Sequence, residues 1–245
     1  MKILLLIPAR MGSSRFPGKP LKKINGKPMI QHVYENVKKN KLIRDLAVAT
    51  CDKKIFNFVK SFDGNAVMTS KKHKRASDRC AEALIKIERK NKIKYDFIVM
   101  VQGDEPMVHK NMISESLRPI LKNRKIKVVN LYSEIKSKKE FTDVNCIKVV
   151  CSKKNNALYF SRKPIPYFKS GKFSLKKQVC IIPFQRDFLI QYIKMKPTPL
   201  EIAESVDMMR ILENGFSVYM AKTKYKTQSV DTIKDLKKVE KLIKK

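Results

Sequence analysis

Short apolar runs alternate with segments of helical periodicity from the first residue of the chain onward. The apolar runs predict strands over residues 2–7, 46–50, 66–69, 97–102, 128–132, 147–151 and 217–221. Apolar residues at helical spacing predict helices over 28–40, 77–90, 200–214 and 232–243. This alternation is typical of βαβ units, so we expect an α/β fold with a doubly wound, mainly parallel sheet.

The chain is predicted to form a single domain over residues 1–245. That length suits one large α/β domain, the sequence has no internal repeat, and seven glycines offer little material for a flexible linker. The stretch 161–199 has a different texture, because prolines interrupt its short apolar pieces. We therefore expect a small inserted subdomain or lid around 161–199.

Composition excludes several classes of protein. Hydrophobic residues make up 43% of the chain, and no run approaches the roughly 18 apolar residues that cross a bilayer. The first apolar run is short for a signal peptide, so we interpret it as a buried strand and expect a cytoplasmic protein. The five cysteines are scattered without Cys-x-x-Cys spacing, which favours reduced thiols over a zinc site or a redox pair.

The chain is strongly basic, with a formal net charge of +33. Such a balance is compatible with a polyanionic partner. The excess comes mostly from Lys spread over every segment, whereas Arg is the residue that binds guanine edges and phosphates in a fork. Nucleic-acid binding is therefore kept as an alternative and is not the function we favour.

The loop directly after the first predicted strand is the first candidate for chemistry. Residues 8–20 carry Arg10, Arg15 and Lys19 among serines and glycines, and ligands of α/β sheets bind at the carboxyl ends of strands. Three cations beside accessible backbone N–H groups suit the oxygens of a triphosphate. A solvated basic loop is the alternative. The loop matches neither a Walker motif nor a Gly-x-Gly-x-x-Gly fingerprint.

The second candidate is the strand that ends in Gln102-Gly103-Asp104-Glu105. If this strand and the first are parallel, Asp104 lies on the same rim as the basic loop. A carboxylate there can hold Mg²⁺, which keeps most of its waters and bridges to substrate phosphates. The alternative is an Asp that caps a strand-to-helix turn.

In order along the chain, several segments resemble the CMP-Kdo synthetases, which are 3-deoxy-manno-octulosonate cytidylyltransferases. The matching segments are PAR-x-x-S-x-R-x-PGKPL at 8–21, GKPMI at 26–30, VQGDEP at 101–106, ALYFSR at 157–162 and VDT at 230–232. The resemblance implies the Rossmann-like nucleotidyltransferase fold and a homodimer that uses the insert as its contact. It also implies attack of the anomeric hydroxyl of an acidic 3-deoxy sugar on the α-phosphate of CTP, with release of pyrophosphate.

The resemblance implies roles for the two motifs described above. Arg10, Arg15 and Lys19 would bind the nucleotide triphosphate. Asp104 and Asp231 would bind Mg²⁺ as the cofactor. Arg10, Lys19 and Asp104 would be the catalytic residues, because positioning and charge neutralisation carry a phosphoryl transfer of this type.

The resemblance also implies a binding segment for the base. Residues 75–79 resemble a Ser-Gly-Thr-Glu-Arg segment that lies near the cytosine in the family. Ser77 and Arg79 match by type and would contact the nucleotide. Arg75 replaces the family's Ser and Ala76 replaces its Gly.

The part of the site that would bind the sugar departs most from the family. The resemblance places Gln102, Tyr159, Arg162, Gln178 and Asp207 there. A His-x-Gly-x-Tyr stretch of the family corresponds to residues 178–186, which lack all three residue types, and Asp207-Met208 replaces a Glu-Gln pair. Because a polar site discriminates strongly between hydroxylated ligands, these changes favour a Kdo-like ulosonic acid without fixing it as Kdo.

Several alternatives therefore stay open at the level of sequence. Within the same class, the sugar is a nonulosonic acid or an 8-amino-substituted octulosonic acid. A member of the family that binds CTP without turnover is a further alternative. The nucleic-acid-binding alternative predicts a steeply salt-dependent affinity for nucleic acid and indifference to CTP.

Overall fold

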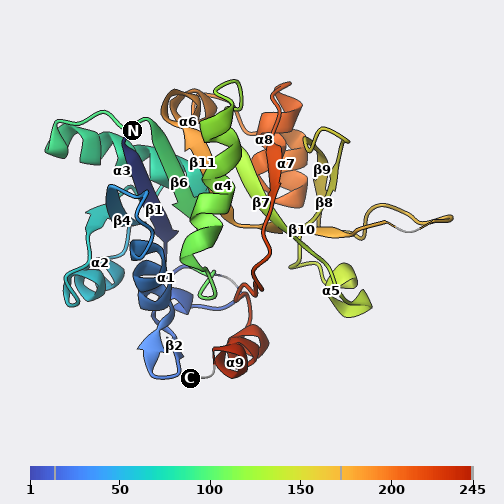
Figure 1. Cartoon of the computed structure of the whole chain (residues 1–245). Helices are drawn as coiled ribbons and strands as arrows, with labels where there is room; N and C mark the ends of the chain where they lie inside the picture. Colours follow the sequence, from blue (N-terminus) through green and yellow to red (C-terminus); the bar gives the residue numbers. More distant parts are fainter. Residues whose placement is uncertain (14, 172, 244–245) are drawn as a thin grey trace.

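A computed structural model of the protein describes residues 1–13, 15–171 and 173–243 (Figure 1). Its first sheet has the strand order β11-β6-β1-β4-β5. These strands are β1 (Ile3–Ala9), β4 (Asp45–Thr50), β5 (Ala66–Met68), β6 (Phe97–Val101) and β11 (Ile181–Gln185). β1 runs parallel to β4 and β6, β4 runs parallel to β5, and β11 is antiparallel to β6 at the edge. The parallel core with β1 between β6 and β4 confirms the doubly wound prediction.

Helices cover both faces of this sheet because β1 is apolar throughout. Leu4 and Leu6 pack on one face with α3 (Ala76–Asn91), α6 (Arg186–Tyr192) and α8 (Asp207–Glu213). Ile3, Leu5 and Ile7 pack on the other face with α1 (Met29–Lys38), α2 (Lys53–Lys60) and α4 (Lys110–Lys122). Successive side chains of a strand point to opposite faces, so this one run serves both halves of the core.

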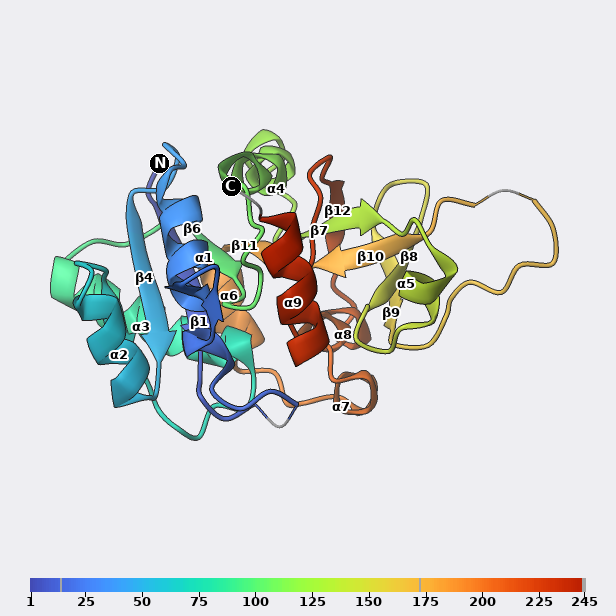
Figure 2. The same ribbon diagram turned by 90° about the horizontal axis from the view of Figure 1, so that it is seen from below.

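A second sheet, with the order β12-β7-β10-β8-β9, lies beside the first (Figures 1 and 2). Its strands are β7 (Val129–Glu134), β8 (Lys148–Cys151), β9 (Ala157–Ser161), β10 (Lys176–Val179) and β12 (Tyr219–Lys222). β12 runs parallel to β7, and the other pairings are antiparallel. A bridge between Val128 and Phe184 joins the sheets, so one core continues into the other.

Several further elements complete the fold. They are η1 (Lys19–Leu21), β2 (Lys23–Ile24), β3 (Lys27–Pro28), α5 (Lys138–Thr142), α7 (Pro199–Glu204) and α9 (Ile233–Leu242). α9 begins after Thr232, whose hydroxyl accepts from the backbone N–H of Asp235 as an N-cap. In the described part of the chain, no helix combines the length and apolar character needed to cross a bilayer.

The observed elements differ from the predicted ones at identifiable residues. The helix predicted over 200–214 is divided into α7 and α8, because Ser205 lies in the left-handed region at φ 52° and ends α7. α2 and α4 were not predicted, and Pro119 within α4 is a residue that ordinarily disfavours a helix interior. Residues 161–199 supply β10 to the second sheet and β11 to the first. Pro183 in β11 is tolerated because β11 is an edge strand of its sheet.

Candidate active site

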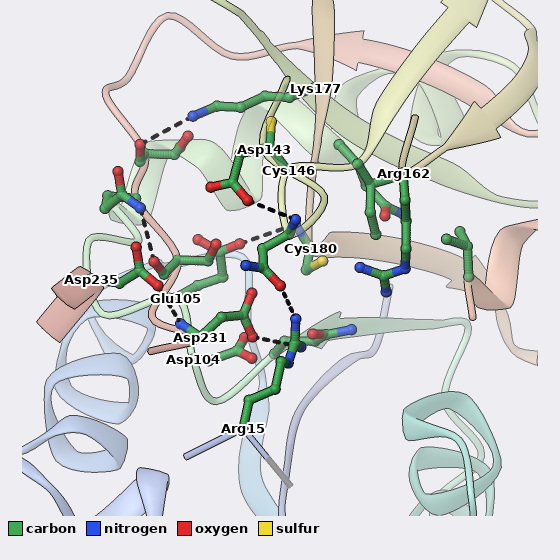
Figure 3. A pocket seen from close by; sticks show the side chains of 18 of the residues that line it. Arg15, Asp104, Glu105, Asp143, Cys146, Arg162, Lys177, Cys180, Asp231 and Asp235 are labelled. Carbon is green, nitrogen blue, oxygen red and sulfur yellow. Dashed lines mark hydrogen bonds and ion pairs between the residues drawn. The ribbon is translucent and has the colours of Figure 1, made fainter. Parts of the chain in front are cut away.

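A cleft of about 870 Å³ opens between the sheets, beyond the carboxyl ends of β1 and β6 (Figure 3). Arg10 and Arg15 line it from the loop after β1, and Gln102 and Asp104 line it from the end of β6. Asp231, which precedes α9, completes this side. The cleft therefore lies where doubly wound sheets bind their ligands.

Backbone geometry brings Asp104 to the end of β1. Gly103 lies so close to this strand that an added Cβ would stand 3.2 Å from the carbonyl oxygen of Pro8 and 3.2 Å from Ile30 Cδ1. A side chain at this position would push the turn away from β1. The carbonyl of Asp104 accepts from the N–H of Val230 at 3.0 Å, which holds the adjoining Asp231 nearby.

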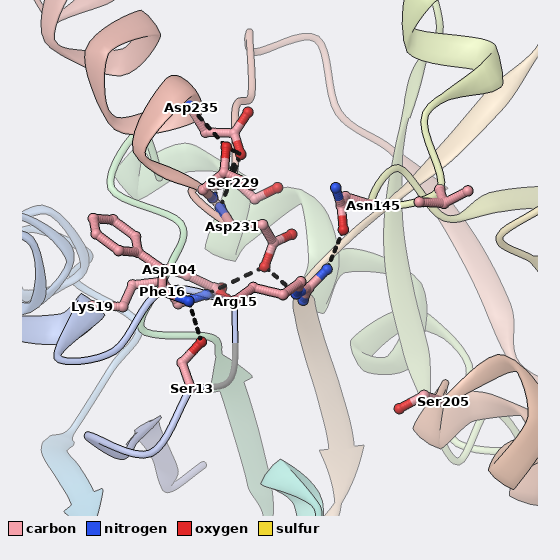
Figure 4. Close-up of polar contacts among 12 residues, drawn as sticks. Ser13, Arg15, Phe16, Lys19, Asp104, Asn145, Ser205, Ser229, Asp231 and Asp235 are labelled. Atoms are coloured by element: carbon pink, nitrogen blue, oxygen red, sulfur yellow. Dashed lines mark hydrogen bonds and ion pairs between the residues drawn. The ribbon is translucent and has the colours of Figure 1, made fainter.

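Lys19 joins these two carboxylates (Figure 4). Its Nζ lies 2.6 Å from Asp104 Oδ2 and 3.3 Å from Asp231 Oδ1. Arg15 Nη2 donates to the same Asp231 oxygen at 2.9 Å, while its Nη1 reaches Asn145 on the opposite side of the cleft. Gly18, at φ 71°, makes the left-handed turn that begins η1 with Lys19.

The charges of this cluster shift each other's ionisation. Burial alone would lower the pKa of Lys19, but the carboxylates of Asp104 and Asp231 outweigh it and raise that pKa above its usual value. Burial and the repulsion of Asp104 raise the pKa of Asp231, although Lys19 and Arg15 oppose the rise. Burial, followed by the charge of Asp104, also raises the pKa of Glu105 to about 8. Glu105 is therefore largely protonated at neutral pH.

Asp104 and Asp231 are chemically suited to a divalent cation. Among the described residues, no cluster of three or more His, Cys, Asp or Glu side chains forms a complete metal cage. A pair of hard carboxylate ligands that already faces a cation, beside a basic loop, instead suits an ion whose remaining ligands are water and substrate phosphates. The residues present therefore fit a metal that arrives with a nucleotide.

The base-binding residues expected from sequence lie behind the cleft wall. Ser77 and Arg79 are buried and are not among the residues that line the cleft. Ser77 Oγ donates to Asp207 Oδ2 at 2.7 Å, and Arg79 Nη1 donates to Thr69 Oγ1 at 2.5 Å. Arg75, the departure noted in the sequence, lines the cleft itself.

Arg75 connects the segment before α3 to the α7–α8 turn. Its Nη1 donates to Ser205 Oγ at 2.9 Å, and its Nε lies 3.0 Å from Glu201 Oε1. Glu201 is fully buried and also receives Nε and Nη2 of Arg210, each at 2.7 Å. Asp207 begins α8 beside this network, 3.8 Å from Arg75 Nε. The network fixes the wall that carries Asp207.

The remaining sugar-binding candidates fall into two groups. Gln102, Gln178, Asp207 and Arg162 line the cleft, whereas Tyr159 does not. The guanidinium of Arg162 donates to the carbonyl oxygens of Glu204, Val144 and Ser205. Arg162 therefore organises the wall through backbone carbonyls.

Some residues that shape the cleft were not predicted from the sequence. Glu105, Asn145 and Lys177 line it, and Lys177 Nζ lies 2.5 Å from Glu140 Oε1 at the mouth. The sequence shows Asp104 and Glu105 as adjacent acidic residues. It does not indicate that the carboxyl group of Glu105 is the buried one and that of Asp104 the more accessible one. Asn145 is recognisable only through its contact with Arg15, which lies 130 positions away.

The fold and this cluster of cations and carboxylates define a nucleotidyltransferase. A family model described as cytidylyltransferase matches residues 4–238 of the chain. The chain is 42% identical to the 3-deoxy-manno-octulosonate cytidylyltransferase of Geobacter metallireducens, over 98% of this chain and 96% of that protein. It is also 42% identical to the protein of that name from Fusobacterium nucleatum, over 100% of this chain and 98% of that protein.

Structural comparison agrees with the sequence matches. A solved structure of CMP:2-keto-3-deoxy-manno-octonic acid synthetase complexed with CTP has a TM-score of 0.89 and 36% sequence identity, covering 99% of this chain and 98% of that chain. A cytidylyltransferase from Leptospira borgpetersenii, 18% identical with a TM-score of 0.64, shares the fold. The chain belongs to the cytidylyltransferase family, as a member of its 3-deoxy-manno-octulosonate cytidylyltransferase group.

Proposed function

We propose that this protein transfers a cytidylyl group from CTP to 3-deoxy-manno-octulosonate (Kdo), with pyrophosphate as the second product. Full-length similarity to proteins of that name supports the reaction. The observation that carries the proposal is the junction of Lys19 with Asp104 and Asp231 at the rim of β1 and β6. It provides cations for phosphates and carboxylates for a metal within one cleft.

In this reaction the anomeric hydroxyl oxygen of the sugar attacks the α-phosphorus and gives up its proton to solvent, and the bond from that phosphorus to the bridging oxygen of the β-phosphate breaks. Negative charge accumulates on the departing pyrophosphate. Arg10, Arg15 and Lys19 come from one loop and can meet that charge with fixed cations. Gln102 and Asp104 lie two positions apart on the same rim of the cleft. A sugar bound beside Gln102 would therefore lie close to phosphates bound beside Asp104.

We propose Mg²⁺ as the cofactor, held by Asp104 and Asp231 together with the substrate phosphates. Bound there, Mg²⁺ would polarise the phosphate oxygens and offset the charge of the leaving group. Lys19 would then exchange its carboxylate partners for phosphate oxygens. The short distances from Lys19 Nζ to both carboxylates support a site built for a cation.

We further propose that residues 1–245 act as one catalytic unit that forms a homodimer through the segment around 161–199. Tyr167 is 91% exposed, and Phe168 and Phe173 are also exposed on the same excursion between β9 and β10. Exposed aromatic side chains gathered on one segment favour a protein contact.

The use of CTP, a cytoplasmic metabolite, supports a cytoplasmic location.

Pyrophosphate release tests the proposed reaction. Purified protein would be mixed with Mg²⁺, Kdo and CTP, with ATP, GTP and UTP as nucleotide controls. We expect release with CTP and Kdo, and loss of release after Asp104→Asn. Asp63→Asn is the matched control, since Asp63 lies at φ 58° in the turn after α2, outside the cleft, where Asn is equally suited.

The outcomes separate the alternatives left open by the sequence. Release with an 8-amino-substituted or nonulosonic acid and not with Kdo would move the assignment to another acidic sugar. CTP binding without release on any of these sugars would contradict catalysis. Near-wild-type release by Asp104→Asn would contradict the metal assignment.

A further inference from the structure

The part of the cleft beside β10 contains a pair of amides whose orientation is fixed from within the core. Asn130 on β7 is fully buried, and its Nδ2 donates to the carbonyl oxygens of Leu131 at 2.7 Å and Val179 at 2.8 Å. Since a backbone carbonyl oxygen can only accept, both hydrogens of this amide are used and the amide cannot be reversed. Asn130 Oδ1 is therefore fixed as an acceptor, and Gln178 Nε2 donates to it at 2.6 Å.

This contact decides which atom Gln178 offers to a ligand. The backbone N–H of Gln178 donates to the carbonyl of Ile147 at 2.8 Å, so the residue is held at its main chain as well as at Nε2. Among the described residues, no hydrogen bond reaches Gln178 Oε1, and this oxygen is not among the buried unpaired atoms. Gln178 therefore lines the cleft with an accessible oxygen of fixed orientation.

A fixed acceptor restricts the group that can bind opposite it. A carboxylate or keto oxygen has no hydrogen to donate and would be repelled, whereas a hydroxyl group or a protonated amine can donate. Gln102 lies on the same wall, because its N–H donates to the carbonyl of Cys180, two residues beyond Gln178. The oxygen of Gln178 thus lies along the wall that leads to Asp104.

We propose that Gln178 is a specificity-determining residue that accepts a hydrogen bond from a hydroxyl group of the sugar acid, and that the buried Asn130 is the positioning residue that imposes this polarity. The inference rests on the proposed function. It adds to that function which group of the sugar, a hydroxyl, binds at Gln178. It excludes Gln178 as the residue that binds the sugar carboxylate.

The test is the Kdo dependence of pyrophosphate release by Gln178→Met, which keeps the side-chain length and removes both polar atoms. We expect the KM for Kdo to rise about ten-fold to one-hundred-fold, because a site built for a hydroxyl loses its acceptor. The KM for CTP and kcat at saturating Kdo should stay near the wild-type values. Gln185→Met is the matched control, since Gln185 Nε2 donates to the carbonyls of Arg124 and Ile126 outside the cleft.

A double-mutant cycle tests the role of Asn130. Asn130→Leu should raise the KM for Kdo in the wild-type background and have no further effect in the Gln178→Met background, because the second residue acts through the first. Thermal unfolding and CTP affinity of each variant separate this effect from loss of the fold. If Asn130→Leu does not fold, the Gln178→Met result alone decides the assignment of Gln178.

The results distinguish this inference from the proposed function. If the wild-type protein releases pyrophosphate with Kdo and Gln178→Met has an unchanged KM for Kdo, the role of Gln178 is wrong and the proposed function stands. Additive effects in the cycle would contradict positioning by Asn130. If the wild-type protein shows no release with Kdo, the proposed function fails and this inference fails with it.

Discussion

Lys19 Nζ lies 2.6 Å from Asp104 Oδ2, closer than to any other charged group of its cluster. The contact joins the loop after β1 to the end of β6, two segments 85 positions apart. Both side chains are largely buried, so their charges act on each other with little screening. The lysine therefore compensates the carboxylates until other charges enter the cleft.

Replacing this lysine should impair catalysis more than folding. We expect Lys19→Met to lower kcat about one-hundred-fold or more, because one fixed cation no longer faces the developing charge on the phosphates. Steady-state pyrophosphate release measures the change. Lys23→Met, at the exposed position of β2, is the matched control and should retain wild-type rates. Wild-type kinetics in Lys19→Met would contradict the assignment of the loop.

The same variant should change how the protein binds a metal without nucleotide. If Asp104 and Asp231 hold the divalent ion as proposed, Lys19, which contacts both carboxylates, competes with that ion in the wild-type protein. We expect Lys19→Met to bind Mn²⁺ about ten-fold more tightly than the wild-type protein when CTP is absent, since one unit of positive charge has been removed. Electron paramagnetic resonance of free Mn²⁺ gives this affinity. Equal affinities would show that Lys19 does not compete with the metal.

The buried network around Glu201 should dominate the stability of the cleft wall. Glu201→Gln removes the fully buried carboxylate that Arg75 and Arg210 share and leaves them only the longer contacts with Asp207 and Asp78, so we expect a loss of about 3–5 kcal/mol in the free energy of unfolding. Urea denaturation measures it. Glu134→Gln, which breaks a surface pair with Lys222, should leave this free energy nearly unchanged. Similar losses in both variants would contradict the role of burial.

The ionic contacts of Glu82 predict that the free energy of unfolding depends on pH in the acidic range. Burial alone would raise the pKa of Glu82, but hydrogen bonds from Lys86, the Ser70 N–H and His73 outweigh it and lower that pKa to about 2. The unfolded chain then binds a proton that the folded protein does not, so this stabilisation is present above pH 4.5 and is lost as the pH falls towards 2.

Glu82→Gln should remove that dependence. The difference in unfolding free energy between the wild-type protein and the variant should shrink by about 1 kcal/mol from pH 4.5 to pH 2, a modest value because the pair is partly exposed. Urea denaturation at a series of pH values provides the measurement. A difference that grows as the pH falls would mean that the sign of the shift is wrong.

The sequence was most informative where local pattern decides structure. The apolar run of β1 and the carboxylates after β6 were sufficient to predict the parallel core and to place Arg10 and Asp104 on one rim. The break at Ser205 could not be predicted in the same way. Its left-handed backbone is held by contacts with Arg75 and Arg162, which come from distant parts of the chain.

Side-chain roles were less predictable than the fold. The guanidinium groups of Arg79 and Arg162 match the family by type, but hydrogen bonds to nearby protein oxygens engage both. The type of a residue determines its charge and its hydrogen-bond donors, whereas the group to which it donates depends on tertiary packing. The fixed orientation of Gln178 likewise depends on Asn130, a buried amide 48 positions away.

The path of the chain between its sheets has a consequence for synthesis on the ribosome. β6 is complete at Val101, yet the strand that covers its outer edge, Ile181–Gln185, emerges some eighty residues later, after most of the second sheet. Until then an apolar strand presents unpaired backbone groups, which is the feature that recruits other chains into aggregates. Nascent chains halted before residue 181 should therefore depend on chaperones, and truncation at that point should yield inclusion bodies and no separately folded half.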